Sequence, residues 1–76
     1  MSRKYLPNKN YVGVTVPIYQ QPISRFDFEG LAVIKKIIEN DENTNYIRAT
    51  VHFLTDQDNV TFERKVNKKD LEGKGE

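Results

Sequence analysis

Three stretches of the chain alternate apolar and polar side chains in a way that predicts β-strands. The first, "YVGVTVPIY" at residues 11–19, places Val12, Val14 and Val16 on one side. β-Branched residues at every second position indicate a strand with one buried face. Pro17 cannot donate a hydrogen bond to a neighbouring strand, so this strand either lies at a sheet edge or ends there.

The other two stretches, "YIRATVHFL" (46–54) and "VTFERKV" (60–66), predict a hairpin around the turn "TDQDN" (55–59). Arg64 has the same inward register as Val60 and Phe62 in the second of them. Because a buried, unpaired arginine is costly, we expect the strand to bulge after Glu63, or Arg64 to leave the sheet at its rim.

The segment "EGLAVIKKIIEN" (29–40) is compatible with a helix. Leu31, Ile34 and Ile38 have the i, i+3, i+7 spacing of a helical stripe, and Ser24 or Asp27 could cap its beginning. A helix over residues 27–40 would make the protein an α+β domain.

The same segment is favoured as a strand by its composition. Four of its apolar residues are β-branched, which suits a sheet. Gly30 would weaken the first turn of a helix by about 1 kcal/mol relative to alanine. In a strand, Gly30 would instead permit a bend, with Ala32 and Ile34 facing inward. We therefore expect an all-β fold and keep the helix as the alternative.

These elements predict one domain over residues 11–71, with a flexible basic arm at 1–10 and a disordered tail at 72–76. The segment "QQPISRFDF" (20–28) reads as a loop whose Ile23 and Phe26 fold back over the core, and Leu71 is placed to plug one end. The expected core comprises Val12, Val14, Val16, Ala32, Ile34, Ile47, Ala49, Val51, Phe53, Val60 and Phe62.

The order of "YVGVTVPIYQQPI", "FEGLAVIKKII", "YIRATVHF" and "VTFERKVNKKDL" resembles the small SH3-like barrels of many short phage and prokaryotic proteins. The resemblance covers residues 11–71. It implies an SH3-like barrel of four to five antiparallel strands with frayed termini, and a tendency toward binding roles. It carries no site residues across, because the matching positions are core and turn positions.

Length and composition limit the classes of protein that this chain can belong to. With 76 residues and no cysteine, the core acts without a disulfide, and a core of this size supplies only about 3–5 kcal/mol. A homo-oligomer is therefore one expectation. No apolar run reaches the roughly 18 residues of a membrane span, and no signal peptide is evident. We expect a cytoplasmic protein without a membrane partner. Its Lys, Asn and Ile bias is typical of phage and mobile-element genes.

Catalytic chemistry has little support in the sequence. Nucleophilic catalysis needs a nucleophile in contact with an orienting base, whereas Ser2 and Ser24 are the only serines and His52 is the only histidine. The "DQDN" stretch lacks the glycine and the distal glutamate of a calcium-binding loop. We expect a non-enzymatic protein without a metal or cofactor.

A protein partner is the first functional hypothesis. The stretch "PIYQQPI" (17–23) carries Ile18, Tyr19 and Ile23, and two prolines limit its conformational entropy. Rigid, tyrosine-bearing segments are effective contact anchors, because little order has to be imposed on binding. The same isoleucines could instead cap one end of the barrel.

Nucleic-acid binding is the alternative hypothesis. Small barrels bind single strands by stacking bases on aromatic rings and pairing phosphates with cations. The residues that could form such a surface are Lys35, Lys36, Tyr46, Arg48 and Lys65. The net charge of +1 neither favours nor excludes a polyanion, and a solvated outer face explains the same residues.

Overall fold

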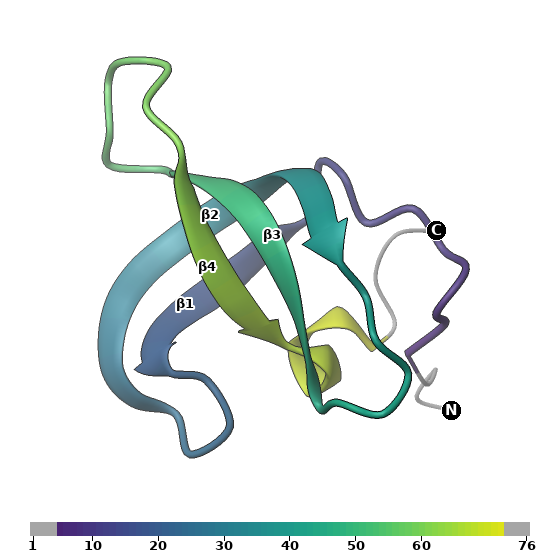
Figure 1. Ribbon diagram of the computed structural model, residues 1–76. Coiled ribbons are helices and arrows are strands. Elements are labelled where there is room, and N and C mark those ends of the chain that lie inside the picture. The colour runs from purple at the N-terminus through teal and green to yellow at the C-terminus, as the bar shows by residue number, and fades with distance from the viewer. Residues whose placement is uncertain (1–4, 73–76) are drawn as a thin grey trace.

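The structure, a computed structural model, describes residues 5–72. One antiparallel sheet follows the chain order β1-β2-β3-β4 (Figure 1). Its strands are β1 (Thr15–Gln21), β2 (Phe26–Glu39), β3 (Tyr46–Phe53) and β4 (Phe62–Asn67), followed by the 3-10 helix η1 (Lys68–Leu71). The mostly β prediction is confirmed. The favoured strand assignment for this segment is correct and the alternative of a helix over 27–40 is wrong, because residues 26–39 form β2.

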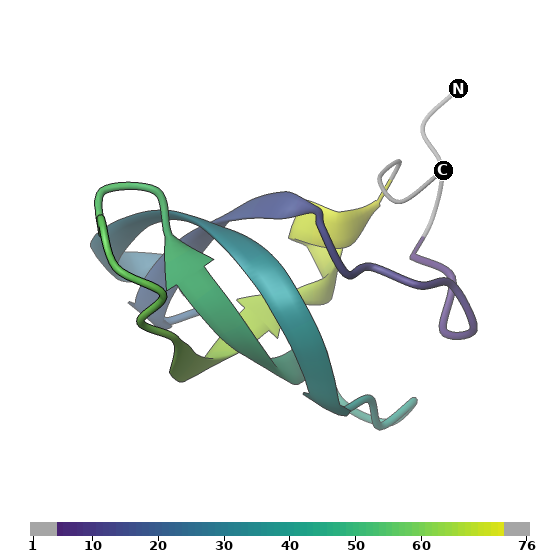
Figure 2. The same cartoon turned by 90° about the horizontal axis from the view of Figure 1, so that it is seen from above.

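The sheet curls around its core but does not close. β1 and β4 are the two edge strands, and the curl brings them close to each other (Figures 1 and 2). No hydrogen-bonded ladder joins these two strands in the described part of the chain. Pro17 lies within β1, at the edge position that its missing N–H requires.

β2 is long enough to serve two neighbours. Its first half pairs with β1 and its second half with β3. Between the pairs Ile18–Gly30 and Tyr19–Phe28 the register shifts, which leaves Glu29 as the extra residue of a β-bulge. Gly30 has a φ of 140°, which side-chain-bearing residues rarely adopt. The predicted bend at Gly30 is therefore present, and β2 is visibly curved in Figure 1.

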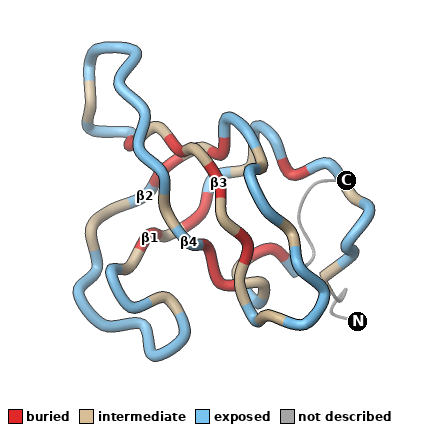
Figure 3. Tube along the Cα trace, viewed as in Figure 1, coloured by how far each residue is buried: buried red, intermediate tan, exposed pale blue. Residues whose placement is uncertain are grey.

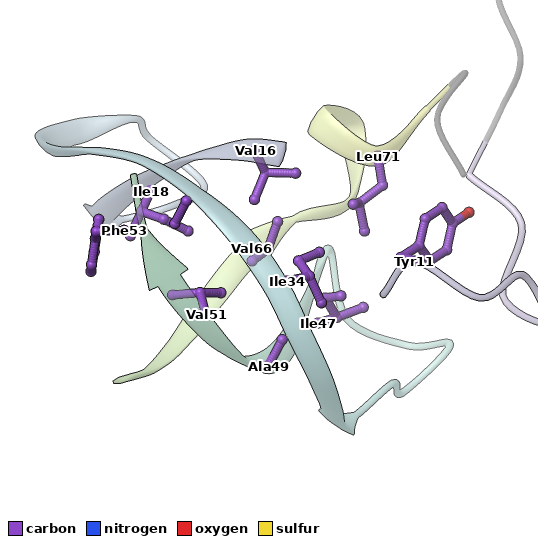
Figure 4. Close-up of a cluster of buried hydrophobic side chains, with 11 residues drawn as sticks. Tyr11, Val16, Ile18, Ile34, Ile47, Ala49, Val51, Phe53, Val66 and Leu71 are labelled. Carbon is purple, nitrogen blue, oxygen red and sulfur yellow. The ribbon is translucent and has the colours of Figure 1, made fainter. Parts of the chain in front are cut away.

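The core lies on the inner side of the curled sheet (Figure 4). Seven predicted core residues are buried there: Val16, Ala32, Ile34, Ile47, Ala49, Val51 and Phe53. Leu71 of η1 is fully buried, as expected for a plug at one end. The sequence interpretation missed Tyr11, Ile18 and Val66, which are buried as well.

Val12 is not a core residue. The backbone N–H of Val14 donates to the Tyr11 carbonyl at 3.1 Å, and Gly13 has a φ of 93°. A positive φ at the third position is typical of a type II turn. This turn directs Tyr11 inward and leaves Val12 48% exposed, while Val14 is half-buried against the core. The regular alternation begins only at Thr15.

The hairpin between β3 and β4 is longer than predicted. Residues 54–61 form its loop, so Val60 lies outside the strand and is 42% exposed. Phe62 does pair with Val51, but it lies at the rim and is 40% exposed. Its ring contacts Phe53, with the centroids 5.9 Å apart.

The predicted loop at residues 20–28 is also wrong in extent. β1 continues to Gln21 and β2 begins at Phe26, so the connection is a tight turn at residues 22–25. Ile23 and Phe26 do not cover the core; they are 51% and 64% exposed.

Residues 5–10 of the predicted arm are tied to the domain through Tyr5, which packs on the core, and through Pro7, whose carbonyl accepts from Asn40. Residues 1–4 of the arm and 73–76 of the tail lie outside the described residues. Tyr5 stacks on Tyr11 with 5.3 Å between ring centroids, and its hydroxyl donates to Asn40. The Tyr11 hydroxyl accepts from the Leu6 N–H at 2.8 Å. Burial raises the pKa of Tyr5 above its ordinary value, so its phenol stays protonated in this contact.

Candidate functional site

The outer side of the β1–β2 hairpin carries a continuous row of apolar side chains. The register pairs Tyr19 with Phe28 and Pro17 with Leu31 across the two strands, and their inward neighbours fill the core. The two rings of the first pair lie 5.3 Å apart. We call this row the apolar face; its members are Pro17, Tyr19, Phe26, Phe28, Leu31 and Val33.

Three members of the apolar face are strongly exposed. Phe26 is 64%, Phe28 59% and Leu31 48% exposed, and Figure 3 shows the exposed stretch where β1 ends and β2 begins. No member is charged, and the other positions on this side, Thr15 and Gln21, are also uncharged. The outer side of the β1–β2 pair is thus uncharged and mostly apolar.

The three residues predicted for protein contact differ in position and burial. Tyr19 is a half-buried member of the apolar face. Ile18 is fully buried and belongs to the core, so it offers no surface to a partner, because its side chain alternates inward from Tyr19. Ile23 is exposed, but it lies in the turn rather than on the strand face.

A bidentate ion pair links the bulge of β2 to the edge strand β4. Arg64 Nε donates to Glu29 Oε1 at 2.9 Å, and Arg64 Nη2 donates to Glu29 Oε2 at 3.2 Å. The guanidinium also lies over the Phe62 ring, 5.2 Å from its centroid. The bulge is what turns Glu29 away from the apolar face and toward β4, since bulges commonly redirect a side chain.

This pair explains the inward register of Arg64. The β3–β4 register is continuous, so the strand does not bulge after Glu63. Arg64 is opposite Ala49 on the core side, yet it lies at the rim with 32% of its side chain exposed. Neither expected alternative is met, because Arg64 stays in β4 and its charge is balanced by the Glu29 carboxylate, which the sequence interpretation missed.

A groove of about 340 Å³ lies along this seam between β1 and β4. Its lining residues are Tyr19, Gln20, Glu29, Glu63, Arg64 and Lys65. Tyr19 thus belongs both to the groove wall and to the apolar face, which makes the two surfaces continuous.

The outer side of β3 and β4 carries charged side chains, and the central one, Arg48, is paired with two carboxylates. Arg48 donates to Glu63 Oε2 at 2.7 Å from Nη2, and approaches Glu39 Oε1 at 3.5 Å. Hydrogen bonding to Glu63 is the main cause of a raised Arg48 pKa. The Lys65 ammonium lies over the Tyr46 ring at 4.9 Å. We call this the charged face; its members are Lys36, Glu39, Tyr46, Arg48, Glu63 and Lys65.

The structure brings together most of the predicted nucleic-acid residues. Tyr46, Arg48 and Lys65 are neighbours on the charged face, and Lys36 pairs with Thr50 beside them. Lys35 is exposed at a second register shift of β2. However, Glu39 and Glu63 occupy the same surface and neutralise Arg48.

His52 has a structural contact. Its Nδ1 lies 2.7 Å from the Val60 carbonyl oxygen, which ties the long β3–β4 loop to the sheet. Across residues 5–72, no three His, Cys, Asp or Glu side chains gather as a metal site. In the same part of the chain, no helix has the length and apolarity needed to cross a membrane.

Comparisons with protein-family models, with curated proteins and with solved structures find no match to this chain.

Proposed function

We propose that this protein is a small non-enzymatic binding module whose partner is another protein, and that the partner contacts the apolar face. The observation that carries the proposal is the exposure of Phe26, Phe28 and Leu31 on one uncharged surface. Contiguous exposed apolar surface on a small domain commonly marks an interaction site.

The side chains of the apolar face have the properties of contact anchors. Aromatic residues are enriched among the few side chains that carry most of the energy of protein interfaces. Tyr19 and Phe28 already support each other through their ring contact, and both project from paired strands rather than from a loop. Little conformational freedom is therefore lost when a partner covers them, which favours binding.

We further propose that the scaffold is related to SH3-like barrels. The four-strand antiparallel order, the curled sheet and the short helix after β4 support this relationship, although the seam between β1 and β4 carries no ladder. A phage or other mobile-element origin is supported by the Lys, Asn and Ile bias. A cytoplasmic location is supported by the cysteine-free composition, which suits a reducing compartment.

Nucleic-acid binding through the charged face is the second candidate. The proximity of Tyr46, Arg48 and Lys65 supports it. The pairing of Arg48 with Glu39 and Glu63 weighs against it, because a phosphate would have to compete with two carboxylates already in contact.

The test uses the purified protein as bait for protein capture and, separately, as a titrant of fluorescent oligonucleotides. A partner on the apolar face should be retained between about 0.1 and about 0.5 M salt, since apolar contacts are not screened. Capture should be lost with Tyr19→Ala and with Phe28→Ser. Leu6→Ser is the matched control, because Leu6 is 52% exposed and lies outside the apolar face.

Two results would contradict the proposal. One is a captured protein whose binding is unaffected by Tyr19→Ala and Phe28→Ser. The other is oligonucleotide binding that collapses as salt rises and is abolished by Lys36→Glu with Lys65→Glu, which would assign the function to the charged face.

A further inference from the structure

We propose that the partner covering the apolar face is a second copy of this chain, so that the protein forms a symmetric dimer through the outer side of β1 and β2. This inference rests on the proposed function, because it uses the same surface. The new element is the identity of the protein partner, a second copy of the chain.

The apolar face exposes enough apolar surface to form the centre of an interface. A fully exposed aromatic side chain presents roughly 150–250 Å², so Phe26 and Phe28, at 64% and 59% exposure, each leave roughly 100–150 Å² uncovered. Leu31 and the half-buried members raise the total to roughly 400–500 Å², which is within the range of the largest patch on a typical monomer, a patch that is often functional. With a polar rim, this approaches the roughly 800 Å² that each partner contributes to a standard interface.

The apolar face is also complementary to a second copy of itself. A two-fold interface places the same patch on both partners. Because no member of the apolar face is charged, two copies can meet there without burying an unpaired charge, which would be costly. The charged face offers no such match: two copies meeting there would have to desolvate Arg48, Glu63 and Lys65.

The open edges of the sheet are protected against the other route to self-association, which is pairing of an edge strand with a second chain. β1 carries Pro17 at its edge, and β4 carries the consecutive charges Glu63, Arg64 and Lys65. Proline and charged side chains are the devices that protect edge strands from pairing with another chain. Association is therefore expected face to face rather than edge to edge.

The curvature of β2 sets the strength of the dimer. A face bent at Gly30 allows close contact only around its centre, which places the interface toward the small, transient class. We expect a dissociation constant of roughly 10 µM to 1 mM.

The experiment is sedimentation equilibrium of the full chain from about 10 µM to about 2 mM, a range chosen to span that affinity. The mass of the wild-type protein should rise from 8.9 kDa toward twice that value, and added salt should not reverse the rise. Leu31→Thr and Phe28→Lys should remain at 8.9 kDa throughout. Leu6→Thr should dimerise like the wild type, since Leu6 has a similar exposure but lies elsewhere.

Concentration-dependent amide shifts in NMR spectra supply the second readout, and they also verify that each variant is folded. The shifts should be confined to β1, the first half of β2 and their turn. A wild-type mass of 8.9 kDa at every concentration would overturn the second-copy inference. So would a dimer whose shifts map to β3 and β4. Either outcome leaves the protein-capture test to decide the proposed function independently.

Discussion

The β1–β2 and β3–β4 hairpins bury similar side chains and expose opposite ones. Inward, the first contributes Val16, Ile18 and Ile34, and the second Ile47, Val51 and Val66. Outward, the first presents the apolar face and the second the charged face. On the charged face, Arg48 is already paired with Glu39 and Glu63, and Lys65 lies over the Tyr46 ring, whereas the large apolar side chains of the first hairpin remain exposed. The apolar face is therefore the one whose side chains still lack contacts.

The largest loss of stability is expected from a substitution in the core that the two hairpins share. Ile34→Ala removes a fully buried side chain from the core and should lower the free energy of unfolding by about 2–5 kcal/mol. Since a core of this size supplies about 3–5 kcal/mol, the variant should be largely unfolded.

Urea unfolding followed by circular dichroism measures this change. Ile38→Ala is the matched control, with the same residue type in the same strand but 42% exposure, and it should cost less than about 1 kcal/mol. Equal losses in the two variants would mean that the assignment of inner and outer positions is wrong.

The next largest loss of stability is expected from breaking the ion pair that links the two hairpins. Glu29→Gln removes one charge of the Glu29–Arg64 pair, whose side chains are 21% and 32% exposed, and should destabilise the fold by about 1 kcal/mol. A double-mutant cycle with Arg64→Met measures the coupling directly. A coupling energy indistinguishable from zero would show that the seam is held by packing alone.

A smaller effect on stability is expected on the apolar face. Phe28→Ser removes a cross-strand ring pair, which contributes about 0.2–1 kcal/mol, and the variant should stay folded while losing association. Thermal unfolding, with mass measured on the same sample, checks both expectations. A drop as large as that of Ile34→Ala would assign Phe28 to the core.

The smallest effect on stability is expected on the charged face, where a binding change should appear instead. Glu39→Gln with Glu63→Gln removes both carboxylates near Arg48 and raises the formal net charge from +1 to +3. Affinity for a single-stranded oligonucleotide at low salt should rise roughly tenfold, because unpaired cations are then available to phosphates. Unchanged affinity would mean that the carboxylates do not limit polyanion binding.

The sequence predicted the fold where alternation was regular and failed where a single backbone feature shifted the alternation. Along β3, every inward residue was identified. Near the beginning of β1, the turn at Gly13 reversed the expected sides of Tyr11 and Val12. Such a turn depends on backbone angles, which the order of apolar residues does not encode.

The candidate site was only partly predictable for the same reason. Tyr19 was identified, but Phe26 and Phe28 were assigned to the loop at residues 20–28, with Phe26 expected to fold back over the core. Their exposure depends on pairing with β1 and on the bulge at Glu29. The inward register of Arg64 was the one available signal that a carboxylate lay nearby, and it did not indicate which carboxylate.

The sharing of β2 between two ladders also bears on how the domain opens. Ala32 and Val33 pair with both β1 and β3. Ile34 pairs with β3 and also hydrogen-bonds to Gly13 and Val14, just before β1. Neither hairpin can detach completely without disturbing these three residues. Sub-global opening should therefore merge with global unfolding there, so their amide protons should exchange with solvent more slowly than those elsewhere in the sheet.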